Sequence, residues 1–435
     1  MNMKIFKSIL IFFLSPKTIN YLKNIGLYKN QYIYKKKLIL YFASSIFTRY
    51  FFKKITSNKY DVRMFENIED YSKKHPELIS FIYKKHVDLF YSSPLFDYKL
   101  KAKLEKVSDC FSYACILKQA YVIGGSNVIL IGKDKAIYDM KFLDKNKKFH
   151  YSDQGMLSYN NKFCMLKIVS SDIIYEKAIF LGGNYSWNYY HLTFDILTKF
   201  DQIDKNIDDL SIPLLIDKVC FETPQFFQLI TILNKNNRKI IPVDHKVSYK
   251  VNDLYVFSSP NIIPPNFLTV NEILAEDILF DTKAIEFLRN NLIKKIDQKE
   301  FPKKIYISRS QASGRRKFNE DEIFSVLEKY GFKTVSPENY SINEQIAMFN
   351  NADFIIGGSG AAFTNILYCK STCKIIIFCK TKLLFSGFST IATIIGTEML
   401  YITENSSSVA ELTNIHESFN INADELQNII SVWTS

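Results

Sequence analysis

Between Lys304 and Phe378, short apolar runs alternate with helical segments, and this alternation limits the possible folds more than any other feature of the 435-residue chain. The strand-like runs read KIYIS, FKTVS, DFIIG and KIIIF. Helical patterns separate them, and two of these open with Asn319 or Ser341 followed three residues later by Glu, the signature of a capping box. Because parallel strands need crossover connections, the pattern predicts a parallel sheet with helices on both faces.

A cluster of glycines follows one of these strands, in the stretch DFIIGGSGAAFTN. The chain has only 14 glycines, yet Gly357, Gly358 and Gly360 fall within four positions. The stretch predicts a turn at the carboxyl edge of the sheet, where ligands bind, and a helix starting at Gly360 whose free N–H groups favour an anion such as phosphate. Ala361 keeps the first helical turn thin. Alternatively, the glycines only let helix and strand pack closely, and their spacing matches neither a Walker loop nor a dinucleotide fingerprint.

Three arginines, Arg309, Arg315 and Arg316, lie in the loop after strand 305–308, at the same predicted edge of the sheet. Guanidinium groups bind phosphate oxygens in a bidentate manner. An arginine-rich loop is often plain solvated surface, but its pairing with the glycine turn favours a diphosphate site.

A third polar cluster lies in GGNYSWNYYHLTFDILTKF, a glycine turn that enters a predicted helix over Trp187–Ile203. Asn188, His191 and Asp195 stand at positions i, i+3 and i+7, so they share one helical face. Three neighbours are expected to lie off this face: Leu192, Ile196 and Lys199. The polar stripe predicts a cleft in which His191 or Asp195 takes a proton from a hydroxyl group. The alternative is a His–Asp pair with a structural role only.

The net charge of +12 is concentrated at the N-terminus, where residues 1–60 hold twelve Lys and Arg and no acid. The apolar runs Ile9–Leu14 and Leu38–Phe47 are shorter than the roughly 20 residues that a membrane span needs. Short apolar patches flanked by lysines predict helices lying on an anionic membrane surface. The alternative is a basic helical subdomain that packs on the rest, and nucleic acid is disfavoured because the remaining chain is neutral.

The rest of the composition predicts two or three domains in a reduced, cytosolic protein. A hydrophobic content of 47% supports several cores, and seven cysteines without a CxxC pair indicate neither a disulfide framework nor a zinc site. We predict a basic, aromatic, helical region over 1–105, with residues 60–100 helical and polar, a first Rossmann-like domain over 106–297 and a second over 298–435. A long helix is expected over Glu272–Ile296, and a terminal helix over Ala410–Trp433.

Together the three motif-bearing stretches resemble glycosyltransferase family 61, over about Ala120–Thr403 and most strongly over Lys304–Phe378. The run from IYISRSQASGRRKFNEDE to GGSGAAFTNILY follows the family's order of motifs, and YYHLTFDIL is similar to its Tyr-His-Trp helix. The resemblance implies an α/β GT-B architecture, with two Rossmann-like domains facing across a cleft. It also implies an inverting transfer without an obligatory metal or other cofactor, from a UDP- or CMP-linked sugar, and the absence of Asp-x-Asp agrees.

The resemblance also implies roles for particular residues. Expected contacts to the donor nucleotide and diphosphate are Arg309, Arg315, Arg316, Gly358, Ser359, Gly360, Ala361, Thr364, Asn365, Glu338 and Gln345. Expected residues of the acceptor cleft are Asn184, Trp187 and Asn188. Asp195 is ranked ahead of His191 as the general base. The chain departs from the family at Ser359, where a His is usual, and at Phe378, where an acid is usual; Leu192 in place of Trp is a milder change.

The expected function is therefore transfer of a sugar to a saccharide or lipid-linked saccharide acceptor, in capsule or lipopolysaccharide synthesis. The expected location is the cytoplasm, on the inner face of a bacterial membrane. The alternative from another class is a catalytically inactive sugar- or nucleotide-binding scaffold of the same fold. Phosphate-ester chemistry is disfavoured because no catalytic Cys, Ser or metal cluster is visible.

Overall fold

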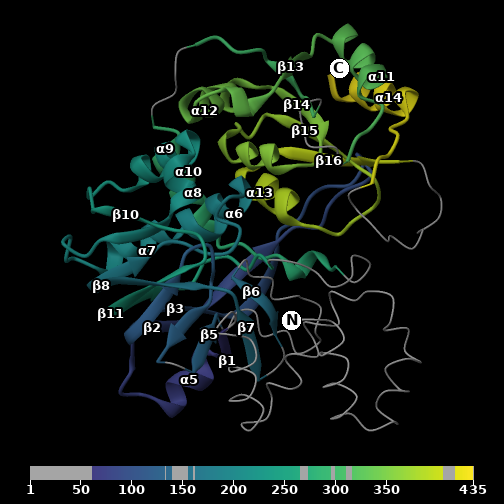
Figure 1. Cartoon of the computed structure of the whole chain (residues 1–435). Coiled ribbons are helices and arrows are strands. Elements are labelled where there is room, and N and C mark those ends of the chain that lie inside the picture. The colour runs from purple at the N-terminus through teal and green to yellow at the C-terminus, as the bar shows by residue number, and fades with distance from the viewer. Residues whose placement is uncertain are drawn as a thin grey trace, which may run out of the picture.

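The computed structural model describes residues 61–132, 134–139, 155–159, 162–264, 273–294, 299–309, 316–404 and 417–434. The predicted membrane-surface segment at 1–60 and the predicted phosphate ligand Arg315 lie outside these residues. Two sheets form the described part, and most of its helices lie between or around them (Figure 1). The fold is mixed α/β, as predicted.

The smaller sheet contains the strands predicted from the alternating pattern. Its five strands are β12 (Lys304–Ile307), β13 (Lys333–Val335), β14 (Phe354–Gly358), β15 (Lys374–Cys379) and β16 (Glu398–Thr403). All are parallel, in the order β13-β12-β14-β15-β16. The order reverses between β12 and β14, and in such sheets the carboxyl ends of the strands at this switch point form a crevice for ligands.

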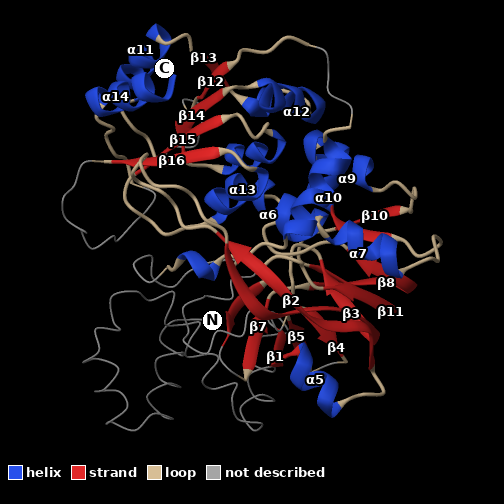
Figure 2. Cartoon of the chain, turned by 180° about the vertical axis from the view of Figure 1, so that it is seen from behind, coloured by secondary structure: helices blue, strands red, loops and turns tan. Residues whose placement is uncertain are grey.

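Helices cover both faces of this sheet (Figure 2). The outer pair is α11 (Glu320–Lys329) and α14 (Ala423–Thr434). The inner set is α12 (Ile342–Asn351), the 3₁₀ helix η6 (Ala361–Tyr368) and α13 (Gly387–Ile395), and a 3₁₀ turn, η5 (Pro337–Asn339), precedes α12. Side chains alternate accordingly: Tyr306 and Ile356 pack with the outer helices, whereas Ile305 and Ile355 pack with the inner ones.

The two predicted capping boxes had different outcomes. Ser341 Oγ accepts a hydrogen bond from the backbone N–H of Glu344, and the Glu344 carboxylate accepts one from the Ser341 N–H, so this box is confirmed. Asn319 makes no such cap; its side chain instead exchanges hydrogen bonds with the backbone of Ile421, at 2.9 and 3.0 Å. Asn319 therefore attaches the C-terminal segment to the start of α11.

The larger sheet is mixed, and only part of it resembles a Rossmann sheet. Its strands are β1 (Asp61–Asn67), β2 (Ile79–Tyr91), β3 (Glu105–Ile123), β4 (Ile129–Ile131), β5 (Lys135–Tyr138), β6 (Met156–Tyr159), β7 (Phe163–Leu166), β8 (Val169–Phe180), β9 (Leu214–Asp217), β10 (Ile240–Val243) and β11 (Val247–Phe257). The order is β10-β9-β8-β11-β3-β4-β5-β1-β7-β6, with β2 also paired to β3. Strands β10, β9, β8 and β11 are parallel, and β3 joins them antiparallel.

The larger sheet with its helices forms one half of the molecule, and the smaller sheet with its helices forms the other. The helices of the first half are α5 (Ile68–Lys74), α6 (Tyr189–His191), the π-helical turn η2 (Leu192–Leu197), α7 (Lys199–Asn206), α8 (Lys218–Glu222), α9 (Pro224–Leu233), the 3₁₀ turn η4 (Ala275–Asp277) and α10 (Thr282–Leu292). The helix predicted over Glu272–Ile296 is thus shorter, because Asp281 caps α10 by accepting a hydrogen bond from the Lys283 N–H at 2.9 Å. The predicted terminal helix begins later than expected, at Ala423.

The prediction that residues 60–100 are helical is wrong. Apart from the seven-residue α5, this region contributes β1 and the 13-residue β2. Strand β2 pairs with β3 from Ile79–Leu117 to Tyr91–Glu105, and its many aromatic residues suit a pleated, half-buried surface. Its partner follows along the chain, and the irregular aromatic spacing gave no sign of this pairing.

One apolar core joins the two sheets. It contains Ile179 and Leu214 from the larger sheet together with Ile305 and Ile355 from the smaller one. Buried hydroxyl groups add a polar link, since the Ser92 N–H at the end of β2 donates to Thr390 Oγ1 of α13 at 2.9 Å. The two sheets therefore share one apolar core and a buried polar contact.

The carboxylate of Asp217 connects two glycine turns of the larger sheet. It is 3% exposed and accepts hydrogen bonds from the backbone N–H groups of Gly125, at 2.7 Å, and Gly183, at 2.8 Å. Burial raises the pKa of Asp217, and these hydrogen bonds oppose the shift. Gly125 has φ +77° and Gly183 φ +154°, so both turns depend on glycine.

We predict that Asp217→Asn lowers the free energy of unfolding by about 1–3 kcal/mol. An amide offers one acceptor oxygen, so its NH₂ group would face one of the two backbone N–H donors. Thermal and urea unfolding measure the loss. Asp253→Asn is the control, since its carboxylate makes a surface ion pair with Lys118 and the change should cost less than about 1 kcal/mol. Equal effects of the two substitutions would contradict the assigned role.

Candidate active site

The switch point of the smaller sheet brings two arginines onto one backbone carbonyl group. Arg309 Nη1 donates to the Ser359 oxygen at 3.0 Å, and Arg316 Nη1 donates to the same oxygen at 3.3 Å. Arg309 follows β12 and Ser359 follows β14, so the predicted convergence of the arginine loop and the glycine turn is present in the structure. Burial lowers the pKa of the Arg309 guanidinium.

The glycine cluster makes room for parts of this same chain. A Cβ on Gly360 would clash with Arg309 Nη1, and one on Gly358 would lie 2.7 Å from Arg309 Cδ. A Cβ on Gly357 would lie 2.7 Å from the Ile307 oxygen of β12. Groups of this same chain therefore lie close to all three glycines: the Arg309 side chain at Gly358 and Gly360, and the backbone of Ile307 at Gly357.

Arg309 is also fixed at its backbone by α11. Glu320 Oε1 accepts hydrogen bonds from the Arg309 N–H at 3.0 Å and from Ser308 Oγ at 2.6 Å. Arg309 and Arg316 line an outer hollow of about 440 Å³ with Glu320. These hydrogen bonds hold the backbone at the end of β12, from which the Arg309 side chain extends.

A second hollow, the central pocket, lies between the two halves of the molecule and has a volume of about 260 Å³. Asn188 and His191 line it from one half. Its lining from the other half is Arg316, Ser359, Gly360, Ala361, Phe378, Lys380, Phe385 and Tyr401, among others. Because Arg316 lines both this pocket and the outer hollow, the two spaces meet at a guanidinium group.

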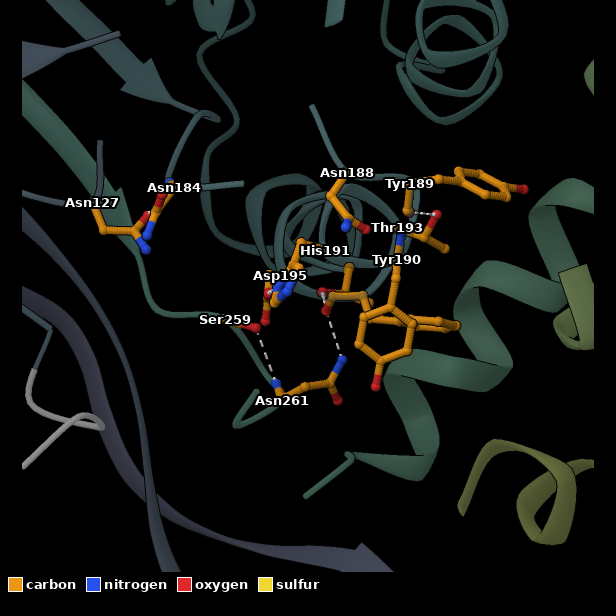
Figure 3. Close-up of polar contacts among 12 residues, drawn as sticks. Asn127, Asn184, Asn188, Tyr189, Tyr190, His191, Thr193, Asp195, Ser259 and Asn261 are labelled. Atoms are coloured by element: carbon orange, nitrogen blue, oxygen red, sulfur yellow. Dashed lines mark hydrogen bonds and ion pairs between the residues drawn. The ribbon is translucent and has the colours of Figure 1, made fainter. Parts of the chain in front are cut away.

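His191 and Asp195 form a hydrogen-bonded pair in which Nδ1 lies 2.7 Å from Oδ2 (Figure 3). A carboxylate only accepts, so Nδ1 carries the hydrogen and Nε2 is the basic nitrogen. His191 lines the central pocket and also a smaller space of about 70 Å³, the inner pocket, where Asp195 lies with Asn184. The pair therefore stands at the boundary between the two pockets.

The helix that carries this pair contains the π-helical turn η2. The Phe194 carbonyl accepts hydrogen bonds from Thr198 Oγ1 at 2.8 Å and from Asn261 Nδ2 at 2.7 Å. π-helical turns are rare and concentrate at functional sites. Ile196 and Lys199, expected to lie off the His–Asp face, both line the inner pocket with Asp195. Lys199 follows Asp195 by four residues, a spacing that puts two side chains on one face of a regular helix, so the expectation for Lys199 was wrong.

Three predicted donor contacts are instead buried between the halves. Tyr189 donates its hydroxyl hydrogen to Asn365 Oδ1 at 2.7 Å, and Asn365 Nδ2 donates to Gln345 Oε1 at 2.9 Å. Thr364 is buried beside them in η6. Asn365 and Gln345 therefore join α6 to η6 and α12, and none of the three residues lines the central pocket or the outer hollow.

Other predicted residues lie in separate places. Glu338 is exposed, and its backbone carbonyl accepts a hydrogen bond from Gln225 Nε2 at 3.2 Å. Gly358 is buried beneath Arg309. The predicted acceptor residues are divided, since Asn184 lines the inner pocket, Asn188 the central pocket and Trp187 a third hollow.

Three residues that line these pockets were not predicted from the sequence. Tyr190 is 6% exposed and lines the central pocket, and its hydroxyl group has no hydrogen-bond partner among the described residues. Lys380 directly follows β15. Because ligands bind at the carboxyl ends of parallel strands, this position could have been predicted from the sequence as a pocket residue. Burial lowers the pKa of Lys199, while Asp139 and Asp195 oppose that shift, and Lys199 lines the inner pocket.

Within the described ranges, no group of three or more His, Cys, Asp or Glu side chains is placed to hold a metal ion. The seven cysteines, which all lie in the described ranges, form no disulfide there. No helix of the described part combines the length and apolar character of a membrane span.

Comparison with protein families places this geometry in a class. Residues 189–376, from the start of α6 into β15, match the family described as Glycosyltransferase 61. The match includes the His191–Asp195 pair, both arginines and the glycine turn. The protein is a glycosyltransferase, and its residues 189–376 are similar to glycosyltransferase family 61. No curated protein matches the chain.

We predict that Asn365→Ala lowers the free energy of unfolding, because it leaves the buried side-chain oxygen of Gln345 without its partner. The Tyr189 hydroxyl would keep only its longer contact to the Tyr368 hydroxyl, at 3.2 Å. Each buried group left unsatisfied costs about 1–3 kcal/mol. Thermal unfolding measures the loss, with Asn252→Ala, which breaks a surface contact to Glu176, as the control. If Asn365→Ala instead unfolds as the wild type does but binds UDP more weakly, the expectation that Asn365 contacts the donor would be supported.

Proposed function

We propose that this glycosyltransferase transfers a sugar from a nucleotide diphosphate donor to a saccharide acceptor with inversion at the anomeric carbon. The observation that carries the proposal is the central pocket, which His191 lines from one half and Arg316 from the other. Asp195 holds His191 from the inner pocket, and Arg309 lies beside Arg316 on the Ser359 carbonyl. A base and a cationic diphosphate site on opposite sides of one space are what a single displacement requires. We also propose a GT-B arrangement, with the pocket in the cleft between two domains that meet near residue 298.

The donor diphosphate would lie between the central pocket and the outer hollow. Arg316 borders both spaces, and Arg309 lies beside it on the Ser359 carbonyl. Guanidinium groups stabilise the negative charge that develops on the leaving diphosphate. Ser359 contributes its backbone oxygen to holding the arginines, which differs from the direct contact expected of the family's usual His.

In the proposed step, an acceptor hydroxyl oxygen attacks the anomeric carbon as the bond to the diphosphate oxygen breaks. His191 Nε2 takes the hydroxyl proton, and the nucleotide diphosphate leaves with the bonding electrons. Asp195 accepts from Nδ1–H, which fixes the tautomer and stabilises the imidazolium that forms. This arrangement favours His191 as the base and Asp195 as the positioning residue, the reverse of the order expected from the sequence.

The proposed reaction needs no obligatory metal, because the two arginines supply the positive charge that a metal ion gives elsewhere. Transfer that persists in excess EDTA would support this, whereas loss on chelation and recovery with Mn²⁺ or Mg²⁺ would contradict it.

We also propose that the enzyme acts in bacterial capsule or lipopolysaccharide synthesis, on the inner face of the membrane. The support is the excess of twelve basic residues and no acids over positions 1–60. Deletion of residues 1–60 should release the protein from vesicles containing anionic lipid, measured by co-sedimentation. Unchanged sedimentation would refute the membrane contact.

We predict that His191→Asn lowers kcat by about 10²–10⁴-fold, because general base catalysis contributes that much. Asp195→Asn should lower kcat by a smaller factor, since the imidazole remains but loses its orientation. Both variants should bind UDP as the wild type does, because neither residue contacts the arginines. Transfer from a panel of nucleotide sugars measures kcat, and a larger loss for Asp195→Asn than for His191→Asn would make the carboxylate the base.

We predict that Arg309→Ala and Arg316→Ala each weaken UDP binding by about 10–100-fold, since a charge-assisted hydrogen bond contributes about 1.5–3 kcal/mol. Titration calorimetry with UDP measures the dissociation constant. Lys333→Ala removes an exposed cation from β13 and is the control. If all three variants bind UDP equally well, the diphosphate is held elsewhere.

A further inference from the structure

Three aromatic rings stand in series beside the proposed base. The ring centroids of Trp187 and Tyr185 are 5.7 Å apart, and those of Tyr185 and His191 are 5.1 Å apart, with the latter pair stacked at 26°. We call these three residues the aromatic track. Contacts between rings act over about 4.5–7 Å, so each ring touches the next.

The loop that carries the track is held in a strained conformation. Tyr185 has φ +60°, a left-handed value that is uncommon for a residue other than glycine. The loop is fixed on both sides of Tyr185: the Gly183 N–H donates to Asp217 at 2.8 Å, and the Ser186 carbonyl accepts from the Cys220 thiol at 3.4 Å. Strain of this kind persists where the surroundings impose it, and it concentrates at binding sites.

Exposure falls along the track toward the base. Trp187 is 49% exposed and borders a hollow of about 250 Å³ with Lys218 and His245. Tyr185 is half-buried and lines the inner pocket, and His191 lines both inner and central pockets. The ring contacts therefore run from the half-exposed Trp187 through Tyr185 to His191, the residue proposed to take the acceptor's proton.

The groups around the track are those that suit a carbohydrate. A sugar ring presents an apolar face of C–H groups, which packs on aromatic rings, and hydroxyl groups, which need hydrogen-bond partners. Asn184 and Ser259 lie in the inner pocket, and Lys218 and His245 border the outer end. A single exposed Trp needs no explanation, but a half-exposed Trp continuous with two further rings and polar neighbours does.

We propose that the aromatic track is an extended acceptor site for an oligosaccharide, whose terminal unit lies at His191 and whose preceding units pack on Tyr185 and Trp187. The enzyme would then elongate a glycan chain in preference to a free monosaccharide. This inference rests on the proposed role of His191 as the base. It adds the class of acceptor to that proposal. Tyr185 and Trp187 line pockets other than the two that Arg316 lines.

The chain has two tryptophans, which allows a direct binding test in the absence of any donor. In a Trp433→Phe variant, Trp187 is the sole tryptophan, and its fluorescence reports contact with a ligand. The probes are glucose, N-acetylglucosamine and their β-1,4-linked dimers, tetramers and hexamers, together with the α-1,4-linked glucose series. We expect a shift of the emission to shorter wavelength, with affinity at least tenfold higher for a tetramer than for the monomer of one series.

Matched variants separate this proposal from the transfer reaction. Trp187→Phe in the wild-type background leaves only Trp433, which packs against Phe354 on the outer face of the smaller sheet, and its emission should not respond. Adding Tyr185→Leu to the single-Trp protein should abolish the dependence on length, whereas Lys333→Ala, an exposed position on β13, should preserve it. UDP alone should leave the Trp187 emission unchanged.

The outcomes are distinguishable from failure of the proposed function. A length-dependent response in a protein whose arginine variants bind UDP normally would keep the acceptor site and reject the donor site. No response to any series, or equal responses to monomers and hexamers, would overturn the aromatic track as an oligosaccharide site, even if transfer is observed.

Discussion

The Ser359 carbonyl group holds the guanidinium groups of Arg309 and Arg316, and the arrangement of the site depends on this contact. It connects the end of β12 to the turn after β14 across the switch point of the sheet. The contact is possible because Gly358 and Gly360 have no side chain where Arg309 lies. Two positive charges are thereby fixed at the carboxyl edge of the sheet, and Glu320 holds the backbone that carries one of them.

The second half of the site is held against the first by groups that take no part in the chemistry. Asn365 receives the Tyr189 hydroxyl from α6 and reaches Gln345 of α12, while one apolar core packs residues of both sheets. Asn261 supports the π-helical turn by donating to the Phe194 carbonyl. His191, the proposed base, and the arginines are thus positioned by contacts within the protein, and such preorganisation lowers the free-energy cost of organising a transition state.

Much of the smaller sheet was predictable from the sequence, because each strand is short, apolar and separated from the next by a helix with local signals. Ser341 caps its helix as predicted, and Gly331 ends α11 with φ +82°. The antiparallel pairing of β2 and β3 was not predictable from the irregular spacing of their side chains, because pairing depends on contacts between segments that no local pattern marks. At the two departures, the Ser359 backbone oxygen accepts hydrogen bonds from both arginines, and Phe378 is a buried residue that lines the central pocket.

The sequence by itself determined the residue types that meet at the site: a helix with His191 and Asp195, an arginine loop after one strand and a glycine turn after another. It did so because strand and helix periodicity, and the rule that parallel strands end at one edge, are local properties of the chain. Only the tertiary structure decided what these residues do for one another. Lys199 lines the inner pocket beside Asp195, Asn365 and Gln345 are buried where α6, η6 and α12 meet, and the Arg309 side chain fills the space beside Gly358 and Gly360. Each outcome depends on which segments pack together, and packing is a property of the whole fold.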